Sequence, residues 1–438
     1  MTAPASTTAS FRRVAALALP ALVVLAAEPL YVLVDTAVVG HLGRTPLASL
    51  AIGGNVLSVA AWLGTVLAYG TTGRSARRYG AGDRAGAVAE GAQASWLAFA
   101  AGLLMAVCAQ LLAGPVAHAL AGDNADVAAG AARWLRVAAL GAPGLLLATA
   151  GNGWLRGVQD TRRPMYYVLG ANLLSAVLCP VLVYGFGVGL IGSAIANATA
   201  QTLSGALFVR ALVAERVSLR PRPSVLYRQL VLGRDLLVRG AAFQACFISA
   251  ATVAARFGSA ALAAHQVALQ LWMFCSMALD AVAIAAQSLV GAALGSGEVT
   301  EARSLARRIA GIGLASGAGF AVVIGAGAGV LPRLFSGDPQ VFAQAMLAWP
   351  WFVCMQPLAG VVFALDGVLI GAGDVRYMRN LTMVAALGGF LPAIWLAYWL
   401  RLGLPGVWAG LTLFIVIRLV ALLARTRSDR WAVVGVVR

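Results

Sequence analysis

The sequence contains no lysine, so all 32 of its cationic side chains other than histidine are arginines. A phosphate-binding P-loop requires a Gly-Lys-Ser/Thr sequence, so this chain cannot form one, and we expect no ATP-driven activity. Charge of either sign is also scarce, because Asp, Glu and Arg make up 11% of the 438 residues, whereas 61% are hydrophobic. A water-soluble domain of this length needs far more charge to cover its surface. The composition therefore predicts an integral membrane protein.

Cysteine and histidine are few, and their spacing excludes two classes of site. The five cysteines all lie in apolar runs without paired spacing, which predicts small buried side chains and no disulfides. The three histidines are scattered along the chain, so they do not form a ligand set. We therefore expect no metal site and no organic cofactor.

Apolar segments of about 20 residues recur along the whole chain and predict membrane-spanning helices, not barrel strands. Arg, Gly, Pro or Asp residues bound each segment. The first half is expected to hold spans at 14–40, 46–72, 86–113, 127–150, 163–185 and 188–212. The second half is expected to hold spans at 235–255, 260–292, 304–331, 340–370, 378–400 and 404–424. About twelve spans follow.

The arginines of the connecting loops predict the orientation. Most of them lie in alternate loops, including Arg74, Arg77, Arg78, the segment 216–234 and the final arginines. By the positive-inside rule, both termini are then cytoplasmic in a multi-pass protein of the cytoplasmic membrane. A net charge of +16 could instead suggest a nucleic-acid partner, but arginines confined to short loops are typical of membrane topology. The lipid bilayer is the expected partner, and nucleic acid is not.

The two halves of the sequence resemble each other. A shift of about 215 residues places Gly80-Ala-Gly82-Asp83 on Gly295-Ser-Gly297-Glu298, and matching segments face the same side. We therefore predict an all-α integral membrane fold of about 12 transmembrane helices, in two six-helix lobes related by a parallel pseudo-twofold repeat. The predicted organisation is an N-terminal lobe at 1–213, a basic cytoplasmic linker at 214–234, a C-terminal lobe at 235–425 and a cytoplasmic tail at 426–438.

The predicted spans contain acidic residues, among them Glu28, Asp35, Asp280 and Asp366. A charged Asp near the centre of a span costs roughly 2.5 to 3.5 kcal/mol on insertion scales, so function is the first hypothesis. Glu28, Tyr31 and Asp35 are spaced to share one helix face. Two ionised carboxylates on one such face would repel, so at least one should carry a proton. The alternative for Glu28 is a place in an aqueous cavity without a role in coupling.

Other residues in the spans suggest a bend and a cavity. Pro20 removes a backbone hydrogen bond from the first helix and predicts a bend there, either static or dependent on protonation. Asp35, Asp280 and Asp366 have no acidic counterparts in the repeat, and a structural role for Asp366 is as consistent with its position as a coupling role. Four further residues of one predicted span are polar or contain sulfur: Gln266, Gln270, Met273 and Met277. They could line a cavity for an apolar or cationic ligand, or they could pack against other helices and face lipid.

Three sequence motifs resemble those of the MATE (multidrug and toxic compound extrusion) transporters, DinF-like branch. They are Pro29-Leu-Tyr-Val-Leu-Val-Asp35-Thr-Ala-Val-Val-Gly-His-Leu-Gly43, Ala264-His-Gln266-Val-Ala-Leu-Gln270-Leu-Trp272 and Leu365-Asp366-Gly-Val-Leu-Ile-Gly371-Ala-Gly-Asp374. The resemblance implies a twelve-helix, two-lobed efflux carrier that exchanges its substrate for protons or Na⁺. It also implies that Asp35 is the protonation site and that Pro20 is the bend.

The resemblance also points to the fifth predicted span. Many members of that branch have an Asn and, four residues later, an Asp near the first-helix Asp. With Asn172 as the point of alignment, this chain has Ser175 and Cys179 at those places. Tyr31, Asn172, Ser175 and Cys179 are therefore candidate cavity residues, and Glu28 is the candidate for the second carboxylate beside Asp35.

These observations predict a monomeric secondary antiporter that is not an enzyme. It would export amphipathic or cationic organic compounds in exchange for protons, with Na⁺ as the second candidate ion and Asp35 as the protonation switch. A flippase for lipid-linked precursors is the alternative. It would be expected to have more helices and a strongly cationic cavity, whereas we expect no arginine in the middle of the membrane. An intramembrane aspartyl protease lacks support, because the sequence around Asp35 does not contain the Tyr-Asp or Gly-x-Gly-Asp pattern.

Overall fold

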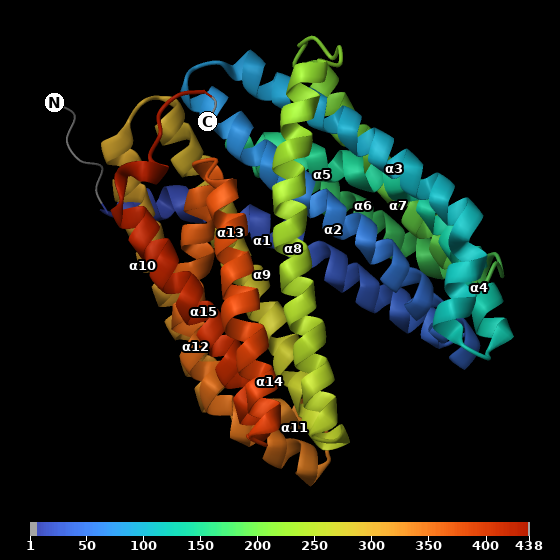
Figure 1. Cartoon of the computed structure of the whole chain (residues 1–438). Coiled ribbons are helices and arrows are strands. Elements are labelled where there is room, and N and C mark those ends of the chain that lie inside the picture. Colours follow the sequence, from blue (N-terminus) through green and yellow to red (C-terminus); the bar gives the residue numbers. More distant parts are fainter. Residues whose placement is uncertain (1–6, 437–438) are drawn as a thin grey trace. The chain divides into compact units, whose positions relative to one another are not determined.

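A computed structural model describes residues 7–436, apart from the side chains of residues 7–10 and 429, and this part of the chain is helical without strands (Figure 1). The N-terminal half contains α1 (Thr7–Gly40), α2 (Arg44–Gly80), α3 (Arg84–Ala121), α4 (Ala125–Ala138), η1 (Ala139–Gly141), α5 (Ala142–Gly157), α6 (Arg162–Pro180), η2 (Val181–Gly185) and α7 (Leu190–Ala214). The C-terminal half contains α8 (Pro223–Arg256), α9 (Ser259–Gly295), α10 (Val299–Ala326), α11 (Leu331–Phe335), α12 (Pro339–Gly371), α13 (Val375–Val384), η3 (Ala385–Phe390), α14 (Leu391–Trp399), α15 (Gly403–Arg427) and η4 (Asp429–Trp431).

Eleven helical segments of the described chain are long and apolar enough to cross a membrane. The twelfth predicted span, 188–212, corresponds to α7, which has 25 residues but is not among these eleven. Three predicted spans are composite, because α4, η1 and α5 together cover 127–150, α6 and η2 cover 163–185, and α13, η3 and α14 cover 378–399. The prediction of an all-α membrane fold is confirmed.

The chain divides into two compact units, which we describe separately. The N-terminal unit is residues 19–233, and the C-terminal unit combines residues 7–18 with residues 234–436. The first turns of α1 thus belong with the second-half helices, in contrast to the predicted lobe 1–213. Both places where the chain passes between units lie inside helices, at Ala18–Leu19 in α1 and at Gly233–Arg234 in α8.

The connection between α7 and α8 is held against α3 by three hydrogen bonds. The Gln93 side chain donates from Nε2 to the Arg220 carbonyl at 2.9 Å and accepts from the Arg222 amide at 2.7 Å. Trp96 Nε1 donates to the Leu219 carbonyl at 2.7 Å. Because α8 begins at Pro223, the second part of the predicted linker 214–234 is helical.

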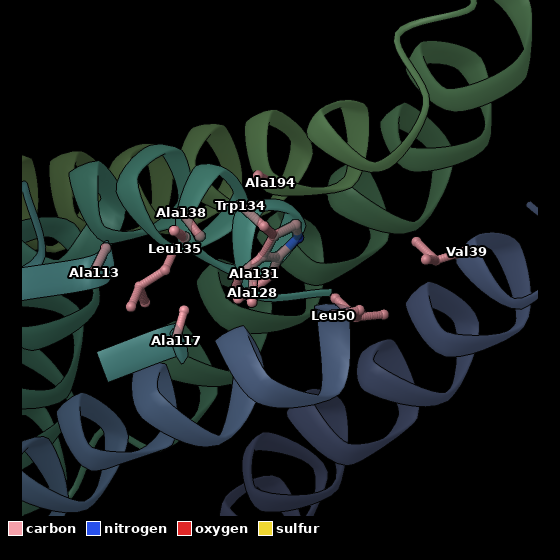
Figure 2. Close-up of a cluster of buried hydrophobic side chains, with 11 residues drawn as sticks. Val39, Leu50, Ala113, Ala117, Ala128, Ala131, Trp134, Leu135, Ala138 and Ala194 are labelled. Atoms are coloured by element: carbon pink, nitrogen blue, oxygen red, sulfur yellow. The ribbon is translucent and has the colours of Figure 1, made fainter. Parts of the chain in front are cut away.

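A core of alanines around Trp134 packs the helices of the N-terminal unit together (Figure 2). Trp134 is 2% exposed, and its indole Nε1 donates to Ser193 Oγ of α7 at 3.1 Å. A Cβ added at Gly53 of α2 would lie 2.5 Å from the Trp134 ring. Small residues around one large ring let the backbones approach closely, which is how membrane helices associate.

The C-terminal unit has an even closer crossing, between α10 and α12. A Cβ at Gly313 would lie 2.2 Å from the Gly360 carbonyl oxygen, and a Cβ at Gly360 would lie 2.0 Å from the Gly313 carbonyl oxygen. The two backbones therefore touch through paired glycines, as in small-residue packing motifs of membrane helices.

Candidate functional site

Asp35 lies in α1 and is buried in the N-terminal unit, with 5% of its surface exposed. The Cys179 thiol of α6 donates a hydrogen bond to Asp35 Oδ1 at 3.2 Å. Ser193 of α7 also lies beside the carboxylate. Three helices thus surround Asp35, and both side chains that adjoin it from α6 and α7 are neutral.

Tyr31 lies one turn before Asp35 on α1 and adjoins Ser175 of α6 and Asn197 of α7. The Tyr31 hydroxyl, Ser175 Oγ and Asn197 Oδ1 are buried, and none has a hydrogen-bond partner within the described chain that meets normal geometry. Buried polar groups normally have partners, so these three atoms leave capacity for a water molecule, a proton or a small cation. We call this group the Asp35 site: Tyr31, Asp35, Ser175, Cys179, Ser193 and Asn197.

The structure brings together the α1 and α6 residues that the sequence predicted. Ser175 and Cys179 adjoin Tyr31 and Asp35, as expected from their alignment. Sequence reasoning missed Ser193 and Asn197. Their only signal is that they lie four residues apart, and so on one face of a helix.

Glu28 does not accompany Asp35. Its exposed side chain lines a cavity of about 160 Å³ in the N-terminal unit, together with Asn152, Arg156 and Asn172. Asp35 is not among the residues that line this cavity. Seven helical residues separate the two carboxylates by about 10 Å along the axis. The role of Glu28 as a second carboxylate beside Asp35 stays a prediction.

Asp366 of α12 has a different environment, in the C-terminal unit. Arg239 of α8 and Arg418 of α15 both donate to its Oδ2 atom. The Phe243 ring lies under both guanidinium groups, with its centroid 5.3 Å from Arg239 Cζ and 4.9 Å from Arg418 Cζ. This ion cluster holds two cations for one carboxylate.

We expected no arginine in the middle of the membrane, and the structure places two buried arginines of the C-terminal unit inside candidate spans. Arg239 and Arg418 lie inside candidate spans and are 9% and 2% exposed. An isolated arginine would be expensive there, but Asp366 and the aromatic ring compensate for both. The argument against a flippase from the absence of such arginines therefore no longer holds. Both cations are nevertheless bonded within the protein.

The other predicted residues are not gathered into a site. Gln266, Gln270 and Met273 on α9 are exposed, Met277 is half-buried, and Asp280 is half-buried on the same helix. Their cavity role stays a prediction. Pro20 lies inside α1, two residues after the boundary between the units, and α1 continues through it.

Comparisons with known proteins cover most of the chain. The MatE family model matches residues 20–181 and 237–399. The chain is 31% identical to Protein DETOXIFICATION 44, chloroplastic, of Arabidopsis thaliana over 95% of this chain and 82% of the relative. It is 32% identical to DNA damage-inducible protein F of Escherichia coli (strain K12) over 93% of this chain and 90% of the relative. It also shares its fold with a solved multidrug resistance MATE family transporter in an outward-facing conformation, at a TM-score of 0.86 and 21% identity over 95% of each chain.

Proposed function

The chain belongs to the MatE family of multi-pass membrane transporters, and we propose that it is a secondary antiporter with Asp35 as its protonation switch. The exported compound is amphipathic or cationic, and the coupling ion is H⁺, with Na⁺ as the second candidate. Export occurs across the cytoplasmic membrane by alternating access, with both chain ends in the cytoplasm and a monomer as the working unit.

The observation that carries this proposal is the chemistry around Asp35. Its described neighbours are a phenol, a thiol and a hydroxyl, and no arginine is among its contacts in the part of the chain that the structure describes. A buried carboxylate without a counter-ion must be neutralised by a proton or by a bound cation. Reversible neutralisation of this group is what an ion-coupled carrier needs.

The cavity beside Glu28 supports a route for protons more than a site for substrate. Its volume of about 160 Å³ is below the roughly 300–1,000 Å³ of typical ligand pockets. At roughly 30 Å³ per water in the liquid, it holds about five water molecules. Its polar lining includes Asn152, Asn172 and Gln201, which can hydrogen-bond such waters.

The oxygen atoms of the Asp35 site keep Na⁺ as a candidate. Asp35, Ser175, Ser193 and Asn197 supply carboxylate, hydroxyl and amide oxygens, which are the ligands that hard cations prefer. Cys179 donates directly to the carboxylate, and a thiol is a poor ligand for a hard cation. This favours the proton.

The test is ion flux in proteoliposomes that contain the purified protein and ethidium, a fluorescent organic cation, as probe substrate. An imposed proton gradient should drive ethidium movement in the wild type, and Asp35→Asn should abolish it while the protein still folds and inserts. Asp126→Asn is the matched control, because that carboxylate is exposed in the same unit and should have no effect.

Two outcomes would overturn the assignment. Wild-type rates for Asp35→Asn would show that another group couples transport. Movement driven by a Na⁺ gradient alone would replace the proton by Na⁺.

A further inference from the structure

Residues of the first turns of α1 and of α10 line a groove in the C-terminal unit. Figure 1 shows where these two helices lie in the fold. Its volume is about 550 Å³, within the range of typical ligand pockets. Its lining is mostly apolar, from Phe11, Val14, Leu305, Ile309 and Ile312. Phe11 is 58% exposed, although it is a large aromatic residue. This groove is separate from the Asp35 site and from the cavity beside Glu28.

Arginines gather at one end of the groove. Arg308 lines it and is half-buried, and Arg12, Arg303 and Arg307 are exposed nearby in sequence on the same two helices. Arg13 bonds Glu301 at 3.2 Å and so joins the start of α1 to the start of α10. The arginines of these two helix ends outnumber the acidic residues Glu298 and Glu301, so this end of the groove has a positive charge.

The groove is open along the α10 backbone. Gly311 lines it, and a Cβ added there would meet no atom within 4 Å. The glycine therefore leaves space against the helix where a larger residue would fill it. Ser316 lies toward the other end, so the arginines mark only one end.

We propose that this groove binds an anionic phospholipid, with an acyl chain along the apolar wall and the phosphate at Arg308. An apolar channel that has cations at one end matches the two parts of such a lipid. Basic pockets between membrane helices bind anionic headgroups, and apolar burial of the chain adds affinity per methylene. A zwitterionic lipid offers the same chain without net negative charge, so charge complementarity selects the anionic class.

The bound lipid would contact the same helix that holds the coupling carboxylate. Phe11 and Val14 lie on α1, which continues without a break to Asp35. Membrane composition could therefore influence α1 through a site outside the transport machinery.

Native mass spectrometry of the purified full chain tests the proposal, with palmitoyl-oleoyl phosphatidylglycerol and palmitoyl-oleoyl phosphatidylcholine as probes. The wild type should retain one phosphatidylglycerol and several-fold less phosphatidylcholine. Arg308→Gln should lower phosphatidylglycerol retention about fivefold, on the scale expected for one arginine near a membrane surface. Arg307→Gln, an exposed neighbour that does not line the groove, should not change it. Added inorganic phosphate should not displace the lipid.

A matched pair of glycine variants distinguishes loss of lipid binding caused by filling the groove from loss caused by a general disturbance of α10. Gly311→Trp should fill the groove and remove the selective binding. Gly319→Trp is the control, because Gly319 lies in the same helix with open space around it but does not line the groove. The melting temperatures of both variants show that they fold. Equal phosphatidylglycerol retention by the two variants, or equal retention of the two lipids by the wild type, would overturn the proposal. Neither result would depend on the transport assignment.

Discussion

Each unit buries an aspartate within a candidate span, Asp35 in one and Asp366 in the other, and these two have opposite surroundings. Asp35 of the N-terminal unit contacts neutral side chains, with the Cys179 thiol as its hydrogen-bond donor. Asp366 of the C-terminal unit binds Arg239 and Arg418 at one oxygen atom. Among the described residues the first carboxylate has no counter-ion bonded to it, whereas the second has two.

The different partners of the two carboxylates suit different roles, a protonation switch at Asp35 and a structural ion pair at Asp366. A buried carboxylate bound by two arginines is needed to compensate their charges, because removing one partner leaves uncompensated buried charge. A carboxylate among neutral donors can gain or lose a proton without breaking an ion pair. The comparison supports the proposed coupling role of Asp35 and predicts a structural role for Asp366.

The largest expected effect is on stability, from Asp366→Asn. It leaves Arg239 and Arg418 buried without a carboxylate, which should lower the free energy of unfolding by about 3–5 kcal/mol. Asp35→Asn breaks no ion pair and should lower it by less than about 1 kcal/mol. Thermal unfolding of both variants in one detergent measures the contrast. Equal shifts in melting temperature would contradict the claim that Asp366, unlike Asp35, compensates buried positive charge.

A triple variant controls for the loss of compensation. Asp366→Leu with Arg239→Met and Arg418→Met replaces the whole ion cluster by apolar side chains, an exchange that is often neutral or stabilising. Its melting temperature should return to near that of the wild type, and it should still transport. A stable triple variant without transport would instead assign a coupling role to Asp366.

A smaller effect is expected at Cys179. Cys179→Val keeps a similar volume but removes the donor that the ionised form of Asp35 uses, so proton release should slow and proton-driven exchange should fall about fivefold. Cys179→Ser keeps a donor and should stay close to the wild type. Initial rates in proteoliposomes measure both. A wild-type rate for Cys179→Val would mean that the thiol does not assist the carboxylate.

Glu28 should show the smallest effect. Its side chain is exposed and lies outside the Asp35 site, so Glu28→Gln should change neither the melting temperature nor, beyond about twofold, the exchange rate. The same flux assay measures this. Loss of transport would mean that Glu28 shares the coupling role. Two acidic residues of α1 would then have a coupling role, in contrast to Asp366 of α12.

The sequence predicts the spans well in their centres and poorly at their ends. Hydropathy marks the segment that fits the hydrocarbon, but helices continue beyond it with charged turns. α2 extends to Gly80 through Arg74, Arg77 and Arg78, eight residues past the predicted end. α8 likewise begins at Pro223 within the predicted linker. Intrahelical hydrogen bonds persist in the headgroup region, which hydropathy does not register.

Within the site, the sequence indicates single residues better than their neighbours. Asp35 is conspicuous because a charged residue in a span is expensive. Ser193 and Asn197 are not, because small polar residues are common in membrane helices and their partners depend on tertiary packing. Arg239 and Arg418 carried the same signal as Asp35, an ionisable group inside an apolar run. The pairing of both with Asp366 requires three helices to meet.

The two connections between the units restrict how those units can move. Both pass through unbroken helix, in α1 and α8, and the irregular segment 215–222 is fixed to α3 by Gln93 and Trp96. A helix has a fixed rise of about 1.5 Å per residue, whereas an extended strand of chain reaches about 3.3 Å per residue. The connections therefore cannot lengthen without breaking hydrogen bonds. One of these two connections lies in α1, at Ala18–Leu19, and so belongs to the same helix as Asp35.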